Sequence, residues 1–157
     1  MKTFTHSLLI LFVLGLALRF PDTARASGYD TYTVPTDPDV VQAQRAIKDK
    51  NWDTAIALLE KAKAREPKNA DIHNLLGFSE RNRGNLDAAF KHYEQALALN
   101  PRHRGAHEYI GEAYLMTGDL TKAEEHLAKL DKLCFFPCAE YSDLKAAIAK
   151  YKQQHPK

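Results

Sequence analysis

Apolar residues recur along this chain with the spacing of amphipathic helices. Ala55, Leu58, Leu59 and Ala62, for example, stand at i, i+3, i+4 and i+7, which places them in one stripe on a helix. Such segments are separated by residue pairs that start or end helices, namely Asp37-Pro38, Gly84-Asn85, Asn100-Pro101 and Gly118-Asp119. The pattern predicts an all-α protein of short helices joined by tight turns.

The helices repeat with a fixed period. Gly77 and Gly111 are related by a period of about 34 residues, as are Gly84 and Gly118. The same period relates Pro67 to Pro101, His73 to His107, His92 to His126, Ala55 to Ala89 and Ala123, and Trp52 to Leu86 and Leu120. It indicates an array of helix pairs in which neighbouring pairs share one core, because a single pair cannot bury its apolar side alone.

The repeated residues resemble the tetratricopeptide repeat (TPR) motif, W-x2-L-G-x2-Y followed by A-x3-F and then A and P. The matching residues are His73, Leu76, Gly77, Ala89, Tyr93, Ala96 and Pro101 in the second repeat, His107, Ile110, Gly111, Tyr114, Ala123 and Leu127 in the third, and Ala55, Leu59, Ala62 and Pro67 in the first. More specifically, the chain is similar to short exported TPR proteins of Gram-negative bacteria, a grouping that shares no single activity.

The resemblance implies a right-handed helical-repeat solenoid of about three TPR helix pairs and a C-terminal capping helix. The expected division is a signal peptide at 1–26, a leader at 27–36, a degenerate first repeat at 37–69, repeats at 70–103 and 104–137, and the capping helix with its tail at 138–157. Leu144, Ala147, Ile148 and Tyr151 would form the apolar side of that last helix, with Lys145, Lys150 and Lys152 facing outward.

Several residues depart from the motif. His73 and His107 replace the usual Trp, and we expect them to be partly buried with one hydrogen bond each. We expect His92 and His126 to be exposed on the outer helices. Glu80 replaces Tyr, and Phe135 stands where Pro is usual.

The N-terminus has the order of a secretory signal peptide. Lys2 precedes an uninterrupted apolar run from Leu8 to Leu18, and Ala24-Arg25-Ala26 fits cleavage before Ser27. The run would span only about 17 Å as a helix, against roughly 30 Å of hydrocarbon in a bilayer, which disfavours a transmembrane anchor. We therefore expect a periplasmic or secreted protein without stable membrane insertion after cleavage. The segment that follows contains Tyr29 and Tyr32 and has no helical pattern; it is expected to be a mobile leader, or to fold back into a groove.

Cleavage changes the charge balance of the chain. The whole chain has 22 basic and 20 acidic residues, and loss of residues 1–26 leaves 19 of each. No basic block remains to follow a phosphate backbone, so nucleic acid is not an expected partner.

Both cysteines, Cys134 and Cys138, lie between the last repeat and the capping helix. An oxidising compartment and the i, i+4 spacing favour a disulfide, which would stabilise this turn by about 2 kcal/mol and cover Phe135 and Phe136. The alternatives are a redox pair or a copper or zinc site. The pair lacks the Cys-x-x-Cys spacing of thiol exchangers, however, and no Met or His lies beside it.

No other pattern indicates an enzyme, a cofactor or a metal site. His103 and His107 stand at i and i+4, but His103 falls in a turn, and Gly111 stands where a zincin motif would place its second His. The sequence contains no P-loop, dinucleotide-binding motif or serine-histidine-aspartate signature.

In TPR proteins the first helix of each pair lines a concave groove. The resemblance assigns groove positions to Asp71, Asn74, Phe78, Arg81 and Asn82, to Gly105, Glu108, Glu112, Leu115 and Met116, and to Asp37, Val40, Gln44, Ile47 and Lys48. Phe78, Leu115 and Met116 would form an apolar patch, although Leu115 and Met116 could equally seal against the capping helix. The family's clamp for C-terminal carboxylates is not supported, because Gly105 and Tyr109 replace its Lys and Arg.

These features favour a non-enzymatic periplasmic adaptor or assembly scaffold that binds a peptide or helix of a partner protein. The alternative is a redox or copper-handling accessory protein that uses Cys134 and Cys138. Self-association is a third possibility, because degenerate end repeats can stack on another copy. Fold alone does not decide among them.

Overall fold

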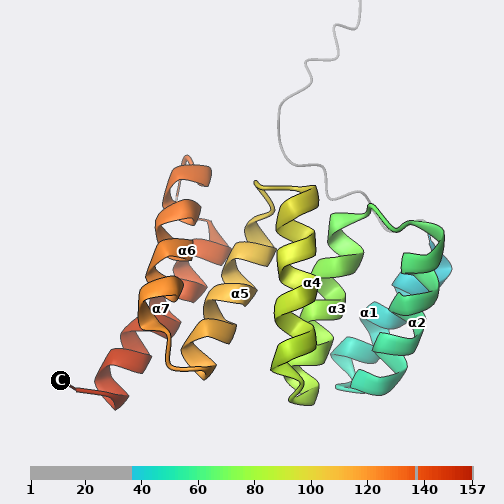
Figure 1. Cartoon of the computed structure of the whole chain (residues 1–157), viewed down its shortest axis with the longest axis horizontal. Coiled ribbons are helices and arrows are strands. Elements are labelled where there is room, and N and C mark those ends of the chain that lie inside the picture. Colours follow the sequence, from blue (N-terminus) through green and yellow to red (C-terminus); the bar gives the residue numbers. More distant parts are fainter. Residues whose placement is uncertain (1–36, 137, 157) are drawn as a thin grey trace, which may run out of the picture. The chain divides into compact units, whose positions relative to one another are not determined.

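The computed structural model describes residues 37–136 and 138–156, and these form seven helices without a strand (Figure 1). The helices are α1 (Pro38–Lys48), α2 (Trp52–Arg65), α3 (Ala70–Arg83), α4 (Leu86–Leu99), α5 (Arg104–Met116), α6 (Leu120–Leu133) and α7 (Ala139–Gln154). The all-α prediction is confirmed. The signal peptide, its cleavage site and the leader with Tyr29 and Tyr32 lie outside the described residues. In the described part, no helix is both long and apolar enough to cross a bilayer.

The second helix of each pair begins with the same cap. The capping residue recurs at the repeat period as Asn51, Asn85 and Asp119. Its side-chain oxygen accepts a hydrogen bond from the backbone N–H three residues later, which belongs to Thr54 (3.3 Å), Ala88 (3.3 Å) and Lys122 (3.0 Å). This bond satisfies one of the N–H groups that a helix start leaves without a partner. The repeated cap therefore fixes where each outer helix starts.

The turn before each cap needs a residue in the left-handed region. Gly84 and Gly118 occupy it with φ of 96° and 82°. In the first repeat the equivalent residue is Lys50, with φ of 56°. Its side chain makes this conformation unfavourable, because the Cβ atom crowds the following carbonyl oxygen. The first repeat thus keeps the turn but lacks the glycine that suits it.

The helices stack in chain order. Within pairs, α1 packs on α2, α3 on α4 and α5 on α6, while α2–α3 and α4–α5 contacts join successive pairs. Helix α7 packs on both α5 and α6, next to the last pair (Figure 1). Leu144 and Ile148 of α7 are buried, as predicted for a capping helix.

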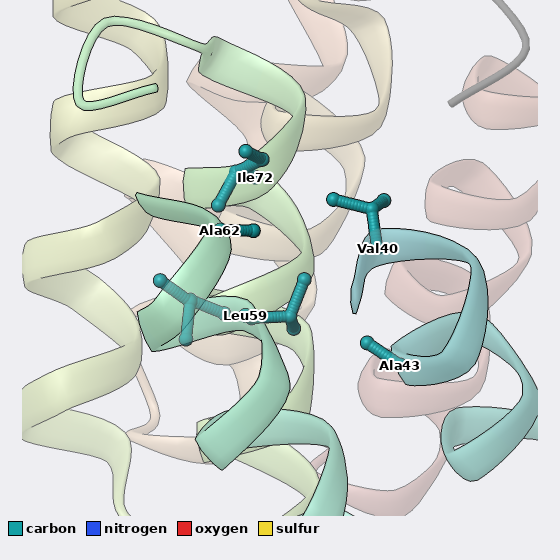
Figure 2. Packing of buried hydrophobic residues seen from close by; sticks show 6 residues of the cluster. Val40, Ala43, Leu59, Ala62 and Ile72 are labelled. Carbon is teal, nitrogen blue, oxygen red and sulfur yellow. The ribbon is translucent and has the colours of Figure 1, made fainter. Parts of the chain in front are cut away.

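Small residues let the helices approach closely. In the first of three core clusters, Ala43 and Ala62 lie fully buried beside Leu59 and Ile72 (Figure 2). In the second repeat the buried Tyr93 ring occupies the space beside Gly77, where a Cβ atom would stand 2.5 Å from the ring. Glycine at this position is therefore required by packing rather than by backbone conformation.

The four repeat-related histidines do not behave alike. His73 and His107 are buried, and each donates a hydrogen bond from Nε2 to a turn carbonyl, of Pro67 at 3.1 Å and of Pro101 at 3.0 Å. The prediction of one hydrogen bond each holds for His73, whereas His107 makes a second one. The prediction that His126 is exposed is wrong. It is buried on the same stripe as Ala123 and Leu130, and its Nδ1 lies 2.9 Å from Nδ1 of His107. His92 is half-buried.

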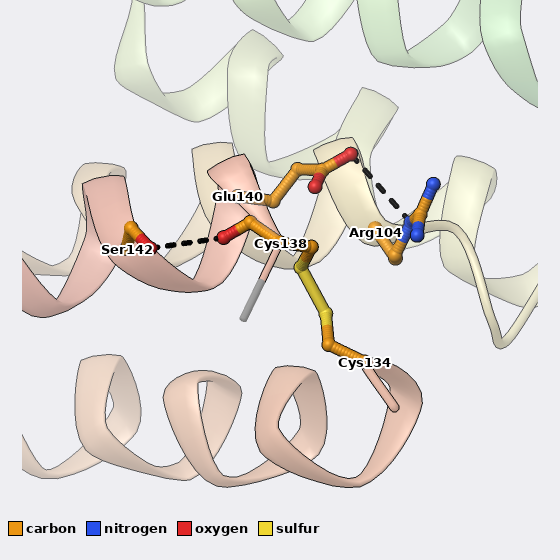
Figure 3. Close-up of a disulfide and its surroundings, with 5 residues drawn as sticks. All are labelled: Arg104, Cys134, Cys138, Glu140 and Ser142. Carbon is orange, nitrogen blue, oxygen red and sulfur yellow. Dashed lines mark hydrogen bonds and ion pairs between the residues drawn. A yellow bond between two sulfur atoms is a disulfide. The ribbon is translucent and has the colours of Figure 1, made fainter. Parts of the chain in front are cut away.

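The cysteines form a disulfide between the end of α6 and the start of α7 (Figure 3). Beside it, Arg104 of α5 pairs with Glu140 at 3.6 Å, and Ser142 donates to the Cys138 carbonyl. The prediction that Phe135 and Phe136 pack under the disulfide is wrong, because they are 94% and 76% exposed. They lie in the turn itself, where the core clusters do not reach.

Lys50→Gly is expected to raise the free energy of unfolding by about 0.5–1 kcal/mol, because glycine removes the left-handed strain but also makes the unfolded chain more flexible. Urea unfolding followed by circular dichroism measures the change. The matched control is Lys61→Gly in the exposed middle of α2, which should cost about 1 kcal/mol. Equal destabilisation by both substitutions would contradict the strain at Lys50.

Candidate functional site

Most of the predicted groove residues occupy α3 and α5, the first helices of the second and third pairs, and the others belong to the first repeat. The structure adds α7, which packs against α5 on the other side from α3 and α4 (Figure 1). Between the last turns of α3 and α5 and the second half of α7 lies an open pocket of about 570 Å³. Its lining is Arg81, Glu112, Leu115, Met116, Gly118, Ala147, Lys150, Tyr151, Gln154 and His155.

Four of the predicted groove residues meet at this pocket: Arg81, Glu112, Leu115 and Met116. Leu115 is half-buried and also packs on the core shared by α6 and α7, whereas Met116 is 57% exposed. Of the two alternatives for this pair, Leu115 thus seals partly against the capping helix. Met116 remains available to a ligand.

An ion pair joins the two helices at the edge of the pocket. The Arg81 Nη1 atom lies 2.5 Å from Glu112 Oε2, and both side chains are largely buried, at 12% and 26% exposure. The Arg81 guanidinium also lies over the rings of Phe78 and Tyr109, at 5.5 and 5.6 Å from their centroids. These contacts hold Arg81 in place, because the guanidinium is attracted both to the carboxylate and to the ring faces.

Phe78 belongs to a row of rings rather than to the pocket. Its centroid is 4.9 Å from that of Tyr109 and 6.1 Å from that of Trp52. The predicted apolar patch of Phe78, Leu115 and Met116 is therefore divided, with Arg81 between the ring row and the pocket.

Glu108 is the most perturbed acid of the groove. It is 8% exposed, and burial, followed by the nearby charges of Glu112, Asp143 and Glu140, raises its pKa to about 8, while Arg81 opposes the shift. At neutral pH this carboxyl group is therefore mostly protonated. It can donate a hydrogen bond as well as accept one.

The two asparagines differ in position. Asn74 is buried with its amide nitrogen beside Gly105, and its carbonyl oxygen finds no hydrogen-bond donor among the described residues. Asn82 is exposed and donates to the Phe78 carbonyl one turn back. Asn74 thus presents an unused acceptor between α3 and α5, whereas Asn82 is used locally.

The first repeat contributes less than predicted. Val40 is assigned to the groove by the motif, but it is 5% exposed and belongs to the first core cluster. Asp37 caps α1 and forms an ion pair with Arg65 at 2.8 Å, and Ile47 packs against the same cluster. The degenerate α1 therefore serves mainly to cover α2, because Val40, Ala43 and Ala46 are buried. Asp71 pairs with His103 at 3.0 Å at the start of α5.

The walls formed by α7 were not predicted. Tyr151, Lys150, Gln154 and His155 line the pocket, whereas the sequence pattern assigns Tyr151 only to the packing side of the helix and Lys150 to the outer side. Lys145 and Lys152 face outward as expected, over Tyr141 and beside Glu124. The repeat period could have indicated these walls, since α7 starts about one period after α5.

The histidines and cysteines that the sequence offers as metal ligands have other contacts in the structure. No three His, Cys, Asp or Glu side chains there are arranged to hold a metal ion. Both cysteines are joined in the disulfide. His103 uses Nδ1 to accept from the Ala106 backbone as the cap of α5, so this nitrogen is not free for a shared site with His107.

Comparison with known proteins identifies the repeats. Two family models described as tetratricopeptide repeat match residues 40–93 and 81–148. No curated protein sequence gives a significant match.

Solved structures with the same fold include MamA (MSR-1), at 27% identity and a TM-score of 0.56, where the match covers 60% of this chain and 55% of that one. The chain thus spans about half of the MamA structure. The first TPR of Spaghetti (RPAP3) bound to the HSP90 peptide SRMEEVD matches at 18% identity and a TM-score of 0.66, covering 76% and 91%. The Yersinia enterocolitica type III secretion translocator chaperone SycD matches at 15% and 0.67, covering 76% and 84%.

Glu108→Gln is expected to stabilise the protein at pH 8 and to have little effect at pH 4.5. The folded protein retains the Glu108 proton up to about pH 8, while the unfolded chain releases it near 4.5, so wild-type stability falls as the pH rises between these values. Glutamine removes this loss and should raise the free energy of unfolding at pH 8 by about 1–3 kcal/mol, allowing for water that reaches the groove.

Urea unfolding at both pH values measures the gain. Glu94→Gln, at an exposed position of α4, is the control and should show no such difference. A gain of the same size at pH 4.5 and pH 8 would show that the Glu108 proton is not its cause.

Proposed function

The chain belongs to the tetratricopeptide repeat family, and we propose that it is a non-enzymatic adaptor that binds a peptide or helix of a partner protein in the pocket between α3, α5 and α7. The observation that carries this proposal is the composition of the pocket. Leu115, Met116 and Ala147 offer an apolar surface, while Lys150 and the Arg81–Glu112 pair place charges at its border. Such a combination suits an apolar anchor residue with polar neighbours.

The geometry favours a peptide over a small metabolite. The pocket is open, and the row of rings at Phe78 and Tyr109 continues from Arg81 toward α2. A ligand seated at Met116 could therefore extend along the Arg81–Glu112 pair toward these rings. An extended or helical segment can use such a surface, because its contacts are spread along its length.

Relatives with the same fold provide a precedent. Spaghetti (RPAP3) has been solved with an HSP90 peptide, and SycD is described as a translocator chaperone. Their low identity to this chain transfers no peptide sequence. The proposal takes from them only that this arrangement of helices accommodates a protein segment.

The proposed location is the periplasm. The order of Lys2, the apolar run of residues 8–18 and Ala24-Arg25-Ala26 supports export and cleavage before Ser27. An oxidising compartment also suits the disulfide between Cys134 and Cys138. In this proposal the disulfide is structural and takes no part in binding.

A photo-activatable amino acid at Met116 is expected to cross-link a partner protein in cells, whereas the same amino acid at Ala98 is not. Met116 lines the pocket, and Ala98 is exposed on α4, outside it. The covalent product of this chain and its partner (the adduct) should be lost when Leu115→Asp is added, because a charge then enters the apolar part of the pocket. It should persist when both cysteines are replaced by serine.

Each alternative outcome has a distinct meaning. Equal adducts at both positions would contradict binding in the pocket. Loss of the adduct in the cysteine variant, with the fold intact by circular dichroism, would favour the redox or copper-handling function. An adduct with a second copy of this chain would show self-association.

The exported protein is expected to have an intact mass that begins at Ser27 and is two hydrogens lower than the reduced chain. Alkylation before denaturation should leave this mass unchanged, because no free thiol remains, and reduction followed by alkylation should add two groups. A mass that retains residues 1–26 would exclude cleavage. Two alkylated thiols without reduction would exclude the disulfide.

A further inference from the structure

Three inter-repeat turns lie at the same end of the helices: 66–69 after α2, 100–103 after α4 and the turn after α6 (Figure 1, top). The repeat period relates their tips. The first turn has Pro67 and Lys68 at its tip, and the second has Pro101 and Arg102 at the equivalent positions. In the third turn these positions are Phe135 and Phe136. The third turn therefore presents two aromatic rings where the other turns present a proline and a cation.

Among the described residues, the two rings belong to none of the three core clusters. Phe135 and Phe136 meet edge to face with centroids 5.0 Å apart, and they are the most exposed large apolar residues described. The disulfide joins Cys134 to Cys138 on either side of them. This covalent closure limits the motion of the turn, so presenting the rings costs little further conformational entropy.

Exposed cations accompany the rings. Lys68, Arg102 and Lys132 are exposed and make no ion pair with a described residue. Two acids at this end have a cationic partner, because Glu140 pairs with Arg104 and Asp37 shares Arg65 with Asp39. Asp71 lies 3.0 Å from Nε2 of His103. Glu66 accepts a hydrogen bond from Asn69, Asp131 precedes Lys132 in the last turn of α6, and Asp143 lies within α7.

We propose that this end of the protein binds the surface of an anionic membrane, with Phe135 and Phe136 inserted at the boundary of headgroups and acyl chains and Lys68, Arg102 and Lys132 facing the anionic headgroups. Aromatic rings beside cations are typical of surfaces that lie at a bilayer interface. Binding is peripheral and reversible, because only two rings enter the lipid.

A lipid surface fits these rings better than a second protein does. Two Phe side chains bury about 150–250 Å² each, well below the area of a stable protein interface. A protruding turn would also require a partner with a matching cavity, whereas lipid adapts to its shape. Peripheral binding is consistent with the described helices, none of which can span a bilayer.

The test measures sedimentation of the protein beginning at Ser27 with sucrose-loaded vesicles of phosphatidylcholine alone or of phosphatidylcholine and phosphatidylglycerol in about a 7:3 ratio. The proposal predicts binding to the anionic vesicles that is weakened about tenfold or more by Phe135→Ser with Phe136→Ser. Replacing both residues by leucine should preserve binding within about threefold, because leucine also partitions into lipid. Circular dichroism checks that each variant is folded.

The charge contribution is tested separately. Lys68→Glu with Arg102→Glu should weaken binding to the anionic vesicles about tenfold or more, since each cation near an anionic surface adds to the affinity. Lys61→Glu with Lys91→Glu, at exposed positions within α2 and α4, reverses the same number of charges and should have a smaller effect.

Three results would overturn the proposal: no binding of wild type to anionic vesicles, equal binding of wild type and the serine variant, or equal binding to neutral and anionic vesicles. If wild type ignores vesicles but a cross-linker in place of Phe136 captures a protein that the serine variant does not bind, the turn is a protein contact instead. None of these results depends on the pocket near Met116, so the adaptor function is judged independently.

Discussion

The close approach of helix to helix through alanine and glycine is the constraint on which the rest of this structure depends. Ala43, Ala62, Ala89 and Ala123 are fully buried, and Gly77 lies directly against the Tyr93 ring. Larger residues at these positions would separate the helices and displace those that follow. The relative position of α3, α5 and α7, and with it the pocket, is therefore determined by residues that never touch a ligand.

The sequence predicted the fold well, because the features that build it repeat. The repeat period and the cap positions locate the helices, and the apolar stripe identifies the buried side of α7. His126 shows where polarity alone misleads. It stands on the stripe that contains Ala123 and Leu130, so its position indicates burial although its polarity suggests exposure. A buried polar residue is acceptable where a partner exists, and that partner, His107, lies on another helix.

The candidate site was harder to predict because it is not formed by one repeat. The motif identified Arg81 and Met116 as groove residues, but the contribution of Tyr151 and Lys150 depends on how a helix outside the repeats packs. Val40 was misassigned because the motif gives each first helix the same role, while an end helix uses its apolar residues to cover its neighbour. Phe135 and Phe136 could not be assigned from hydrophobicity, since exposure depends on whether the core reaches the turn.

The two ring nitrogens of His107 differ in their response to acid, because only one of them can take up a proton. Nε2 donates to the Pro101 carbonyl, so it carries its hydrogen whether the ring is neutral or charged. Nδ1 must therefore accept from Nδ1 of His126, and this contact holds only one proton. Burial lowers the pKa of both rings, that of His126 to about 4. His126 can take up a proton on Nε2 and still donate from Nδ1, but a proton on Nδ1 of His107 would place two N–H groups against each other between α5 and α6, while the bond to the turn persists. Protonation of His107 would therefore weaken the contact between the two helices of the third pair and leave its contact with the preceding turn in place.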